Sequence, residues 1–209
     1  MHKYWDEVWA ESDFDEYRKY VDGHIAALDS YEFISYFQRN HIISVCDAAC
    51  GFGAYSVMLS KRSFQLSGFD ISANSVNLTK AMLASYLCQH NDYKVCDITS
   101  IDFVDESFDG VVAHAVIDHL YLNNAKIALN ELLRITKPDG LIFITFDGLS
   151  EDDETNEYIT QADGSRQYNN GLLFRHYTNN DINDFLCNQT VIHRSINRKG
   201  DREIIIRRN

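Results

Sequence analysis

The sequence lacks several features that would mark a membrane, secreted or metal-stabilised protein. No run of about 18 apolar residues occurs, which excludes a helix that spans a membrane. The five cysteines form no CxxC pair and no zinc-type spacing with histidine, so we expect reduced thiols, a cytoplasmic location and no metal site. The first residues are acidic and aromatic rather than basic and then apolar, so we expect no secretory signal.

Positive charge is also scarce. Lysine and arginine number 19 against 31 aspartates and glutamates, which gives a formal net charge of -12. Because phosphate binding normally needs a surplus of basic side chains on one face, we expect no nucleic-acid partner. The only dense basic group lies between residues 194 and 208, where a solvated face of a terminal hairpin is favoured over a site that docks RNA.

Proline occurs once, and we find neither repeats nor low-complexity segments. The 209 residues therefore suit one domain with its own core. Pro138 lies in a KPDG segment that predicts a turn between two apolar runs. We predict a helical cap over 1–40, a core over 41–147, an insertion beside the bound substrate over 148–178, and a last helix with a terminal hairpin over 179–209.

After residue 40 the apolar pattern alternates between the spacing of strands and that of helices. Predicted strands cover 41–47, 64–70, 93–97, 108–116 and 141–146, with helices between most of them. This order predicts an α/β fold, a doubly wound, Rossmann-like sheet of seven mostly parallel strands with helices on both faces. Segments 190–197 and 202–208 predict an antiparallel hairpin at its edge. Ser72 and Thr178 are predicted helix N-caps, with Asp181 completing a capping box.

Four polar side chains fall at predicted strand ends and so gather along one edge of the sheet: Asp47, Asp70, Asp97 and His114. The first is followed by AACGFG, in which Gly51 and Gly53 lack the Cβ that would hold a ligand away from the backbone. Asp70 lies at the end of the next predicted strand, where a carboxylate can accept hydrogen bonds from ribose hydroxyls. A packing turn and helix caps are the structural alternatives for these residues.

Five segments, in this order, resemble the class I S-adenosylmethionine-dependent methyltransferases. They cover about residues 40 to 147 and read DAACGFG, GFDIS, CDITSIDFVDESFD, AHAVIDHL and LNELLRITKPDGLIFITF. The resemblance implies S-adenosylmethionine as cofactor and S-adenosylhomocysteine as product. It assigns Asp47, Ala49, Gly51 and Gly53 to the methionine portion. It further assigns Asp70 to the ribose, Ile71, Asp97 and Ile98 to the adenine, and His114 to the methionine end.

Two positions depart from the family pattern, which usually has glycine where Ala49 and Asp139 stand. We expect Ala49 to be tolerated if its φ stays negative. The competing assignment is a dinucleotide-binding Rossmann domain. The sequence motif of such domains has a glycine or alanine at the position where this chain has Ser56, which disfavours that assignment. The chain also lacks the length for a separate catalytic domain.

The predicted function is methyl transfer to a small-molecule acceptor by in-line displacement. If the acceptor loses a proton, the candidate catalytic residues are His114, His119 and His176. The alternative interpretations of these histidines are structural: a helix cap, a packing histidine or part of a surface loop. A cofactor-binding regulatory or scaffold protein is the alternative, and RNA or protein methylation is ranked below it. Assembly into a homodimer stays open.

Two segments are candidates for closing the site. The aromatic residues Tyr4, Trp5, Trp9 and Tyr17 recur at helical spacing, which favours core packing over a lid. The acidic segment 147–171 has no clear periodicity, and a solvated loop is favoured over a functional one.

Overall fold

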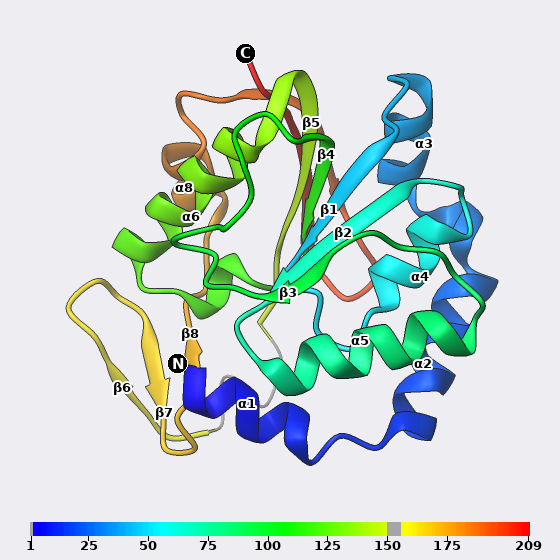
Figure 1. Ribbon diagram of the computed structural model, residues 1–209. Coiled ribbons are helices and arrows are strands. Elements are labelled where there is room, and N and C mark those ends of the chain that lie inside the picture. Colours follow the sequence, from blue (N-terminus) through cyan, green and yellow to red (C-terminus); the bar gives the residue numbers. More distant parts are fainter. Residues whose placement is uncertain (1, 150–155) are drawn as a thin grey trace.

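The computed structural model describes residues 2–149 and 156–209, and its central layer is a seven-stranded sheet of order β3-β2-β1-β4-β5-β10-β9 (Figure 1). Strands β1 to β5 are parallel, and β10 is antiparallel to both β5 and β9. The bounds are Ser44–Ala48 for β1, Gln65–Asp70 for β2, Tyr93–Val95 for β3, Phe108–Ala113 for β4, Thr136–Phe146 for β5, Thr190–Ile196 for β9 and Arg202–Arg207 for β10. The predicted fold and terminal hairpin are confirmed.

Helices cover both faces of this sheet (Figure 1). One core lies between the sheet and α2, α3, α4 and α5, and the other lies between the sheet and α6 and α8. Their bounds are Phe14–Ala26 for α2, Glu32–Arg39 for α3, Ala54–Ser60 for α4, Ala73–Ser85 for α5, Leu122–Ile135 for α6 and Asn179–Phe185 for α8. Short 3-10 helices lie at Leu28–Ser30 (η1) and Ile117–His119 (η2).

The strands are apolar on both faces because both faces are covered. In β10, Ile204 and Ile206 belong to the core under α6 and α8, whereas Ile205 belongs to the opposite core. All three are almost fully buried. A continuous run of isoleucine is therefore the pattern expected of a strand buried on both faces.

The predicted N-caps are also present. The Ser72 hydroxyl accepts a hydrogen bond from the Ser75 amide at the start of α5. Thr178 and Asp181 form the reciprocal capping box at the start of α8. These local hydrogen bonds fix where each helix begins, because they satisfy amides that have no partner within the helix.

The KPDG segment does not form a separate turn. Strand β5 begins at Thr136, directly after α6, and includes the segment. The reason is a long-range pairing that the local sequence does not reveal: the Asp139 amide donates to the Arg208 carbonyl, and the Arg208 amide donates to the Gly140 carbonyl. Asp139 has a φ of +62°, the region in which glycine is most easily accommodated.

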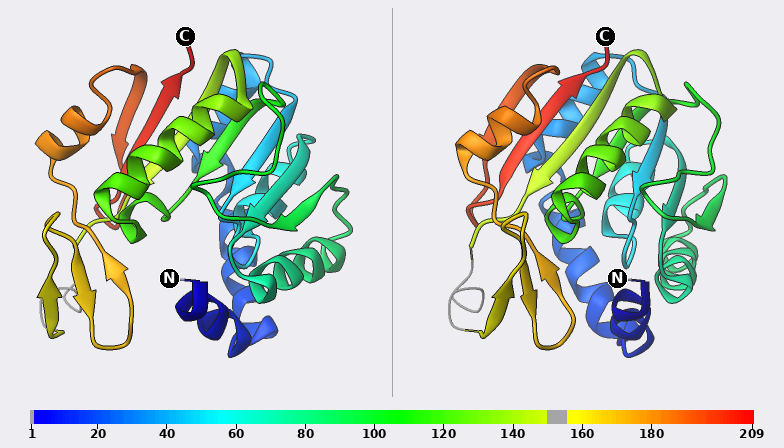
Figure 2. Two further views of the ribbon diagram at one scale, coloured as in Figure 1. Left: turned by 60° about the vertical axis from the view of Figure 1, so that its left-hand side comes forward. Right: turned by 90° about the vertical axis from the view of Figure 1, so that its left-hand side faces the viewer.

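Segment 147–171 also differs from the expected solvated loop. Its described part contributes to a small antiparallel sheet of order β6-β7-β8, at Tyr158–Thr160, Arg166–Tyr168 and Leu173–Phe174. We call this the accessory sheet, and Figure 2 shows it below the main sheet, at the same end of the molecule as the N-terminal helix. Strands of two or three residues give too little alternation to be recognised. The predicted insertion 148–178 includes 150–155, which lie outside the described residues.

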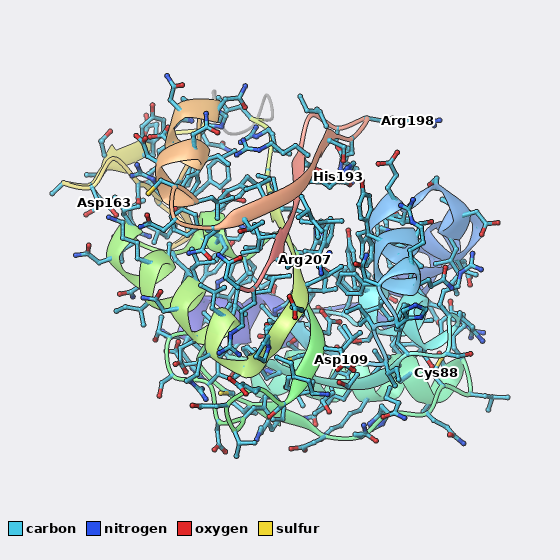
Figure 3. The ribbon with its side chains drawn as sticks, turned by 90° about the horizontal axis from the view of Figure 1, so that it is seen from above. Cys88, Asp109, Asp163, His193, Arg198 and Arg207 are labelled. Atoms are coloured by element: carbon cyan, nitrogen blue, oxygen red, sulfur yellow. The ribbon has the colours of Figure 1, made fainter. Side chains whose placement is uncertain are left out.

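Asp109 joins three neighbouring strands at their amino ends, and Figure 3 views the molecule from this end. Its Oδ2 accepts hydrogen bonds from the amides of Ile43 and Ser44 and from the Ser44 hydroxyl. Its Oδ1 accepts from Lys137 Nζ at 2.7 Å. Burial alone would raise the pKa of Asp109, but these hydrogen bonds outweigh it and lower the pKa to about 2.

We expect Asp109→Asn to lower the free energy of unfolding at pH 7 by about 1–2 kcal/mol, because charge-assisted hydrogen bonds are lost. Since the folded-state pKa lies below the unfolded value, the carboxylate stabilises the fold above about pH 4, and this contribution is lost as the pH falls through about 2. The difference between wild type and variant in urea unfolding should therefore shrink between these pH values. The exposed Asp184→Asn is the control, and a pH-independent difference would contradict the assignment.

Candidate functional site

The turn after β1 has an unusual backbone. Ala49, Gly51 and Gly53 have φ values of +61°, +53° and +86°. The condition under which Ala49 was expected to be tolerated, a negative φ, is therefore not met. The turn is held by hydrogen bonds from the Cys50 amide to the Phe69 carbonyl and from the Gly53 amide to the Cys50 carbonyl, and these fix the backbone despite the Ala49 methyl group.

The two glycines of this turn have different surroundings. A Cβ on Gly51 would lie 3.3 Å from the ring of Trp9, which is tighter than ordinary van der Waals contact. A Cβ on Gly53 would lie 3.1 Å from Thr79 of α5. Gly51 therefore permits the Trp9 ring to approach the backbone of the turn, and Gly53 permits the turn to pack against α5.

Asp70 connects the ends of β1 and β2. Its Oδ2 accepts a hydrogen bond from the Gly51 amide and its Oδ1 accepts one from the Ser72 amide, both at 3.0 Å. The side chain is buried, and burial raises its pKa although the backbone hydrogen bonds oppose the shift. One carboxylate thus orients the glycine turn and the start of α5.

Asp47 lies beneath this turn. The Ser56 hydroxyl donates to its Oδ2 at 2.5 Å, and the Tyr93 hydroxyl donates to Ser56 Oγ at 2.7 Å. Burial raises the pKa of Asp47 to about 6. Ser56, which occupies the position where a dinucleotide fingerprint has a small apolar residue, therefore belongs to a buried polar chain that supports the turn.

A cavity of about 250 Å³ opens at the carboxyl ends of the strands. It is lined by His2, Trp5, Trp9, Ala49, Gly51, Phe69, Asp70, Ile71, Cys96, Asp97, Ile98, Thr99, Ala115, Val116, His119, Leu120 and Asn124. Six of the predicted cofactor residues meet here: Ala49, Gly51, Asp70, Ile71, Asp97 and Ile98. The other three, Asp47, Gly53 and His114, do not line it. No lysine or arginine lines the cavity within residues 2–149 and 156–209.

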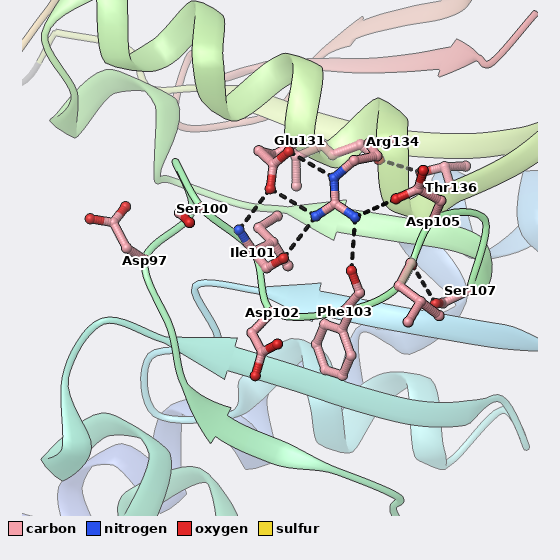
Figure 4. Close-up of polar contacts among 12 residues, drawn as sticks. Asp97, Ser100, Ile101, Asp102, Phe103, Asp105, Ser107, Glu131, Arg134 and Thr136 are labelled. Atoms are coloured by element: carbon pink, nitrogen blue, oxygen red, sulfur yellow. Dashed lines mark hydrogen bonds and ion pairs between the residues drawn. The ribbon is translucent and has the colours of Figure 1, made fainter.

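The loop that carries Asp97 is fastened to α6 by Arg134 (Figure 4). Arg134 donates to the carbonyl oxygens of Ile101 and Phe103 and forms an ion pair with Asp105. Glu131 accepts from Arg134 and also from the Ile101 amide. This network fixes the path of the loop between β3 and β4, which forms one wall of the cavity.

The N-terminal helix α1, His2–Ala10, covers the cavity, with none of its residues fully buried. Trp5 packs its ring edge-on against His119, with centroids 5.0 Å apart. Asp6 anchors the helix, since its Oδ1 accepts from the Ser72 hydroxyl and its carbonyl accepts from Asn74 Nδ2. The helical spacing of Trp5 and Trp9 favoured a place in the core, but both tryptophans line the cavity.

The three candidate catalytic histidines lie in different places. His119 lines the cavity, and its Nδ1 lies 2.9 Å from the Leu173 carbonyl of the accessory sheet. Because a carbonyl only accepts, Nδ1 carries the hydrogen. His114 lies beside Tyr55, and His176 does not line the cavity.

Sequence reasoning missed several cavity residues, among them Phe69, Val116, Leu120 and Asn124. Phe69 belongs to a predicted strand, but the apolar pattern of a strand does not by itself show which of its residues reach a cavity. Val116 and Leu120 follow β4, so their proximity to the strand end was the available signal.

Among residues 2–149 and 156–209, no helix has the length and apolarity that crossing a membrane requires. The same residues contain no group of three or more His, Cys, Asp or Glu arranged to hold a metal ion.

The sequence model of a family described as "Methyltransferase domain" matches residues 46–144. These residues form a class I methyltransferase domain. The domain includes β1, β2, β3 and β4 and most of β5, and so contains the turn, the acids and most of the cavity wall. The antiparallel β10 between β5 and β9 also separates this sheet from an all-parallel dinucleotide-binding sheet.

Known proteins resemble both the sequence and the fold. A malonyl-[acyl-carrier protein] O-methyltransferase from Yersinia pestis is 28% identical over 135 residues, which are 63% of this chain and 47% of that protein. The chain thus spans about half the length of the curated relatives it matches most significantly. The PH0226 protein of Pyrococcus horikoshii OT3 has a similar fold, with a TM-score of 0.74, 18% identity, and coverage of 95% of this chain and 93% of that one. Magnesium protoporphyrin IX methyltransferase from Synechocystis PCC 6803 gives a TM-score of 0.65, 16% identity, and coverage of 90% and 84%.

The positive φ of Ala49 predicts an unusual effect of glycine. We expect Ala49→Gly to raise the free energy of unfolding by up to about 1 kcal/mol, because glycine relieves the left-handed strain that alanine bears. The same exchange at the exposed helical Ala81 should lower it by about 1 kcal/mol. Urea unfolding of both variants measures the two free-energy changes. Destabilisation by Ala49→Gly would show that the turn has another backbone conformation.

Proposed function

We propose that the protein transfers a methyl group from S-adenosylmethionine to a small-molecule acceptor. The observation that carries this proposal is the meeting of Gly51, Asp70 and Asp97 in one cavity of a methyltransferase domain. These residues come from three neighbouring strand ends, β1, β2 and β3.

The chain's own residues fit the proposed cofactor. Each Asp70 oxygen accepts one backbone amide, and a carboxylate oxygen has a second lone pair with which to accept a ribose hydroxyl. Thr99 donates to Oδ1 of Asp97, so Oδ2 remains to accept from an adenine amino group. Ile71 and Ile98 supply apolar walls for a flat base. When bound, S-adenosylmethionine supplies an electrophilic methyl group on a sulfonium.

Relatives of the same fold support the cofactor. The Synechocystis enzyme was crystallised with bound S-adenosylhomocysteine, as was 1,6-didemethyltoxoflavin-N1-methyltransferase from Burkholderia thailandensis, whose structure has a TM-score of 0.64 with this chain. The second of these also contains its small-molecule acceptor.

The acceptor proposed here is small and not anionic. The cavity has two carboxylates, Asp70 and Asp97, and no described lysine or arginine in its lining. A malonyl carboxylate, the group named in the curated relatives, would therefore find no cationic partner there. The net charge of -12 also disfavours nucleic acid.

Asp70 provides the first test. We expect Asp70→Ala to weaken S-adenosylhomocysteine binding by at least about thirtyfold, because two charge-assisted hydrogen bonds to the ribose and the support of the Gly51 turn are lost. Calorimetric titration measures this, with Asp184→Asn as control and thermal unfolding as a check on folding. Unchanged affinity in Asp70→Ala, or tighter binding of NAD by the wild type, would refute the proposed cofactor.

The tryptophans provide a second test. Both tryptophans of the chain, Trp5 and Trp9, line the cavity, so S-adenosylhomocysteine should change the intrinsic fluorescence. Asp6→Ala removes an anchor of α1 and should speed dissociation about threefold to tenfold in stopped-flow measurements. The exposed Glu11→Gln is the control. A dissociation rate that Asp6→Ala leaves unchanged would show that α1 does not retain the ligand.

A further inference from the structure

A second group of titratable side chains lies beside the glycine turn without lining the cavity. His24 of α2 hydrogen-bonds through Nδ1 to the Tyr31 hydroxyl at 2.5 Å. The Tyr31 ring lies edge-on to Tyr55 of α4 at 6.3 Å, and the Tyr55 ring lies 4.4 Å from His114. Four aromatic side chains from four separate segments therefore form one cluster, which we call the His-Tyr cluster.

Strand order places this cluster next to Ala49 and Ala115, which line one end of the cavity. Along the sheet edge, Asp97 follows β3, Asp70 ends β2, and Ala49 follows β1, with Ala115 next after β4. His114 immediately precedes Ala115, and its Nδ1 and the Ala115 amide both bond to the Thr145 hydroxyl oxygen. A ligand with its base at Asp97 and its ribose at Asp70 therefore extends its other end toward β1, β4 and the His-Tyr cluster.

Two polar groups of the cluster lack partners. The Tyr55 hydroxyl and Nε2 of His114 make no hydrogen bond with any of residues 2–149 and 156–209, although Tyr55 is only 8% exposed. Neither atom is among the completely buried polar atoms that lack a partner in these residues, so both atoms are accessible to a ligand. The two rings are adjacent, with centroids 4.4 Å apart.

The cluster carries no charge of its own at neutral pH. Burial lowers the pKa of His24 and lowers that of His114 to about 4. Burial also raises the pKa values of Tyr31 and Tyr55, so both phenols stay protonated.

The charged groups that influence the cluster come from other elements. Lys199 and Asp201 of the β9–β10 turn act on His114, and Lys199 also acts on His24. Glu203 of β10 acts on both tyrosines, and Asp47 acts on Tyr55. Carboxylates outnumber the single lysine in this set, so the surroundings disfavour an anion.

Resting on the proposed function, we propose that the His-Tyr cluster is the acceptor subsite and that it takes a small, uncharged aromatic compound bearing a hydroxyl or amino group. The aromatic rings supply stacking surfaces for a flat acceptor. The Tyr55 hydroxyl and His114 Nε2 bind the acceptor's polar group, and the Tyr31–His24 hydrogen bond holds Tyr31 beside Tyr55. The acceptor would then approach the end of the cavity opposite Asp97.

The test uses phenol and aniline as probes and benzoate as the charged control. Each is added to protein with ¹⁵N-labelled histidine, both with and without S-adenosylhomocysteine, and the ring signals of His24, His114 and His119 are followed by NMR. We expect phenol and aniline to shift His114 and His24, and benzoate to leave them unchanged. Tyr55→Phe should weaken phenol binding about fivefold, whereas the exposed Tyr20→Phe should not.

Other results would overturn the subsite. Shifts confined to His119 would place the probe in the cavity, and no shift of His24 or His114 with either probe would show that the cluster is packing alone. Calorimetry of S-adenosylhomocysteine on the same samples tests the cofactor separately. Loss of cofactor binding would thus refute the proposed function, while failure of the probes with the cofactor bound would refute only the subsite.

Discussion

The geometry of the site depends on the two backbone hydrogen bonds that Asp70 accepts. Its carboxylate lies at the end of β2 and holds the amide of Gly51 on one side and that of Ser72 on the other. A buried carboxylate is costly unless its oxygens are satisfied, and these amides satisfy it while leaving lone pairs toward the cavity. The same bonds place α5, whose first turn holds Asp6 of the covering helix through Ser72 and Asn74.

Much of this arrangement follows from local sequence. Alternating apolar patterns indicated the parallel strands, and the carboxyl ends of such strands meet at one edge, so the meeting of Asp70 and Asp97 was predictable. The helix N-caps at Ser72 and Thr178 were also predictable, because their hydrogen bonds join residues that are close in sequence.

The features that escaped prediction depend on distant partners. The backbone of Ala49 is set by a turn pinned to Phe69, and the path of Asp139 by pairing with Arg208. The His-Tyr cluster joins residues from four segments with no common spacing. The aromatic residues of α1 repeat as a core helix would, and only their position over the cavity distinguishes a cover from a core.

The contact between the accessory sheet and His119 is made by a main-chain carbonyl, that of Leu173. A side-chain substitution that leaves the backbone in place cannot remove this acceptor. The exposed side chains of the accessory sheet, such as Ile159, can therefore change without loss of the hydrogen bond that fixes the His119 tautomer, whereas the buried Leu173 and Phe174 are constrained by packing. Divergence of the exposed residues in that sheet and constancy of the histidine's orientation are physically compatible.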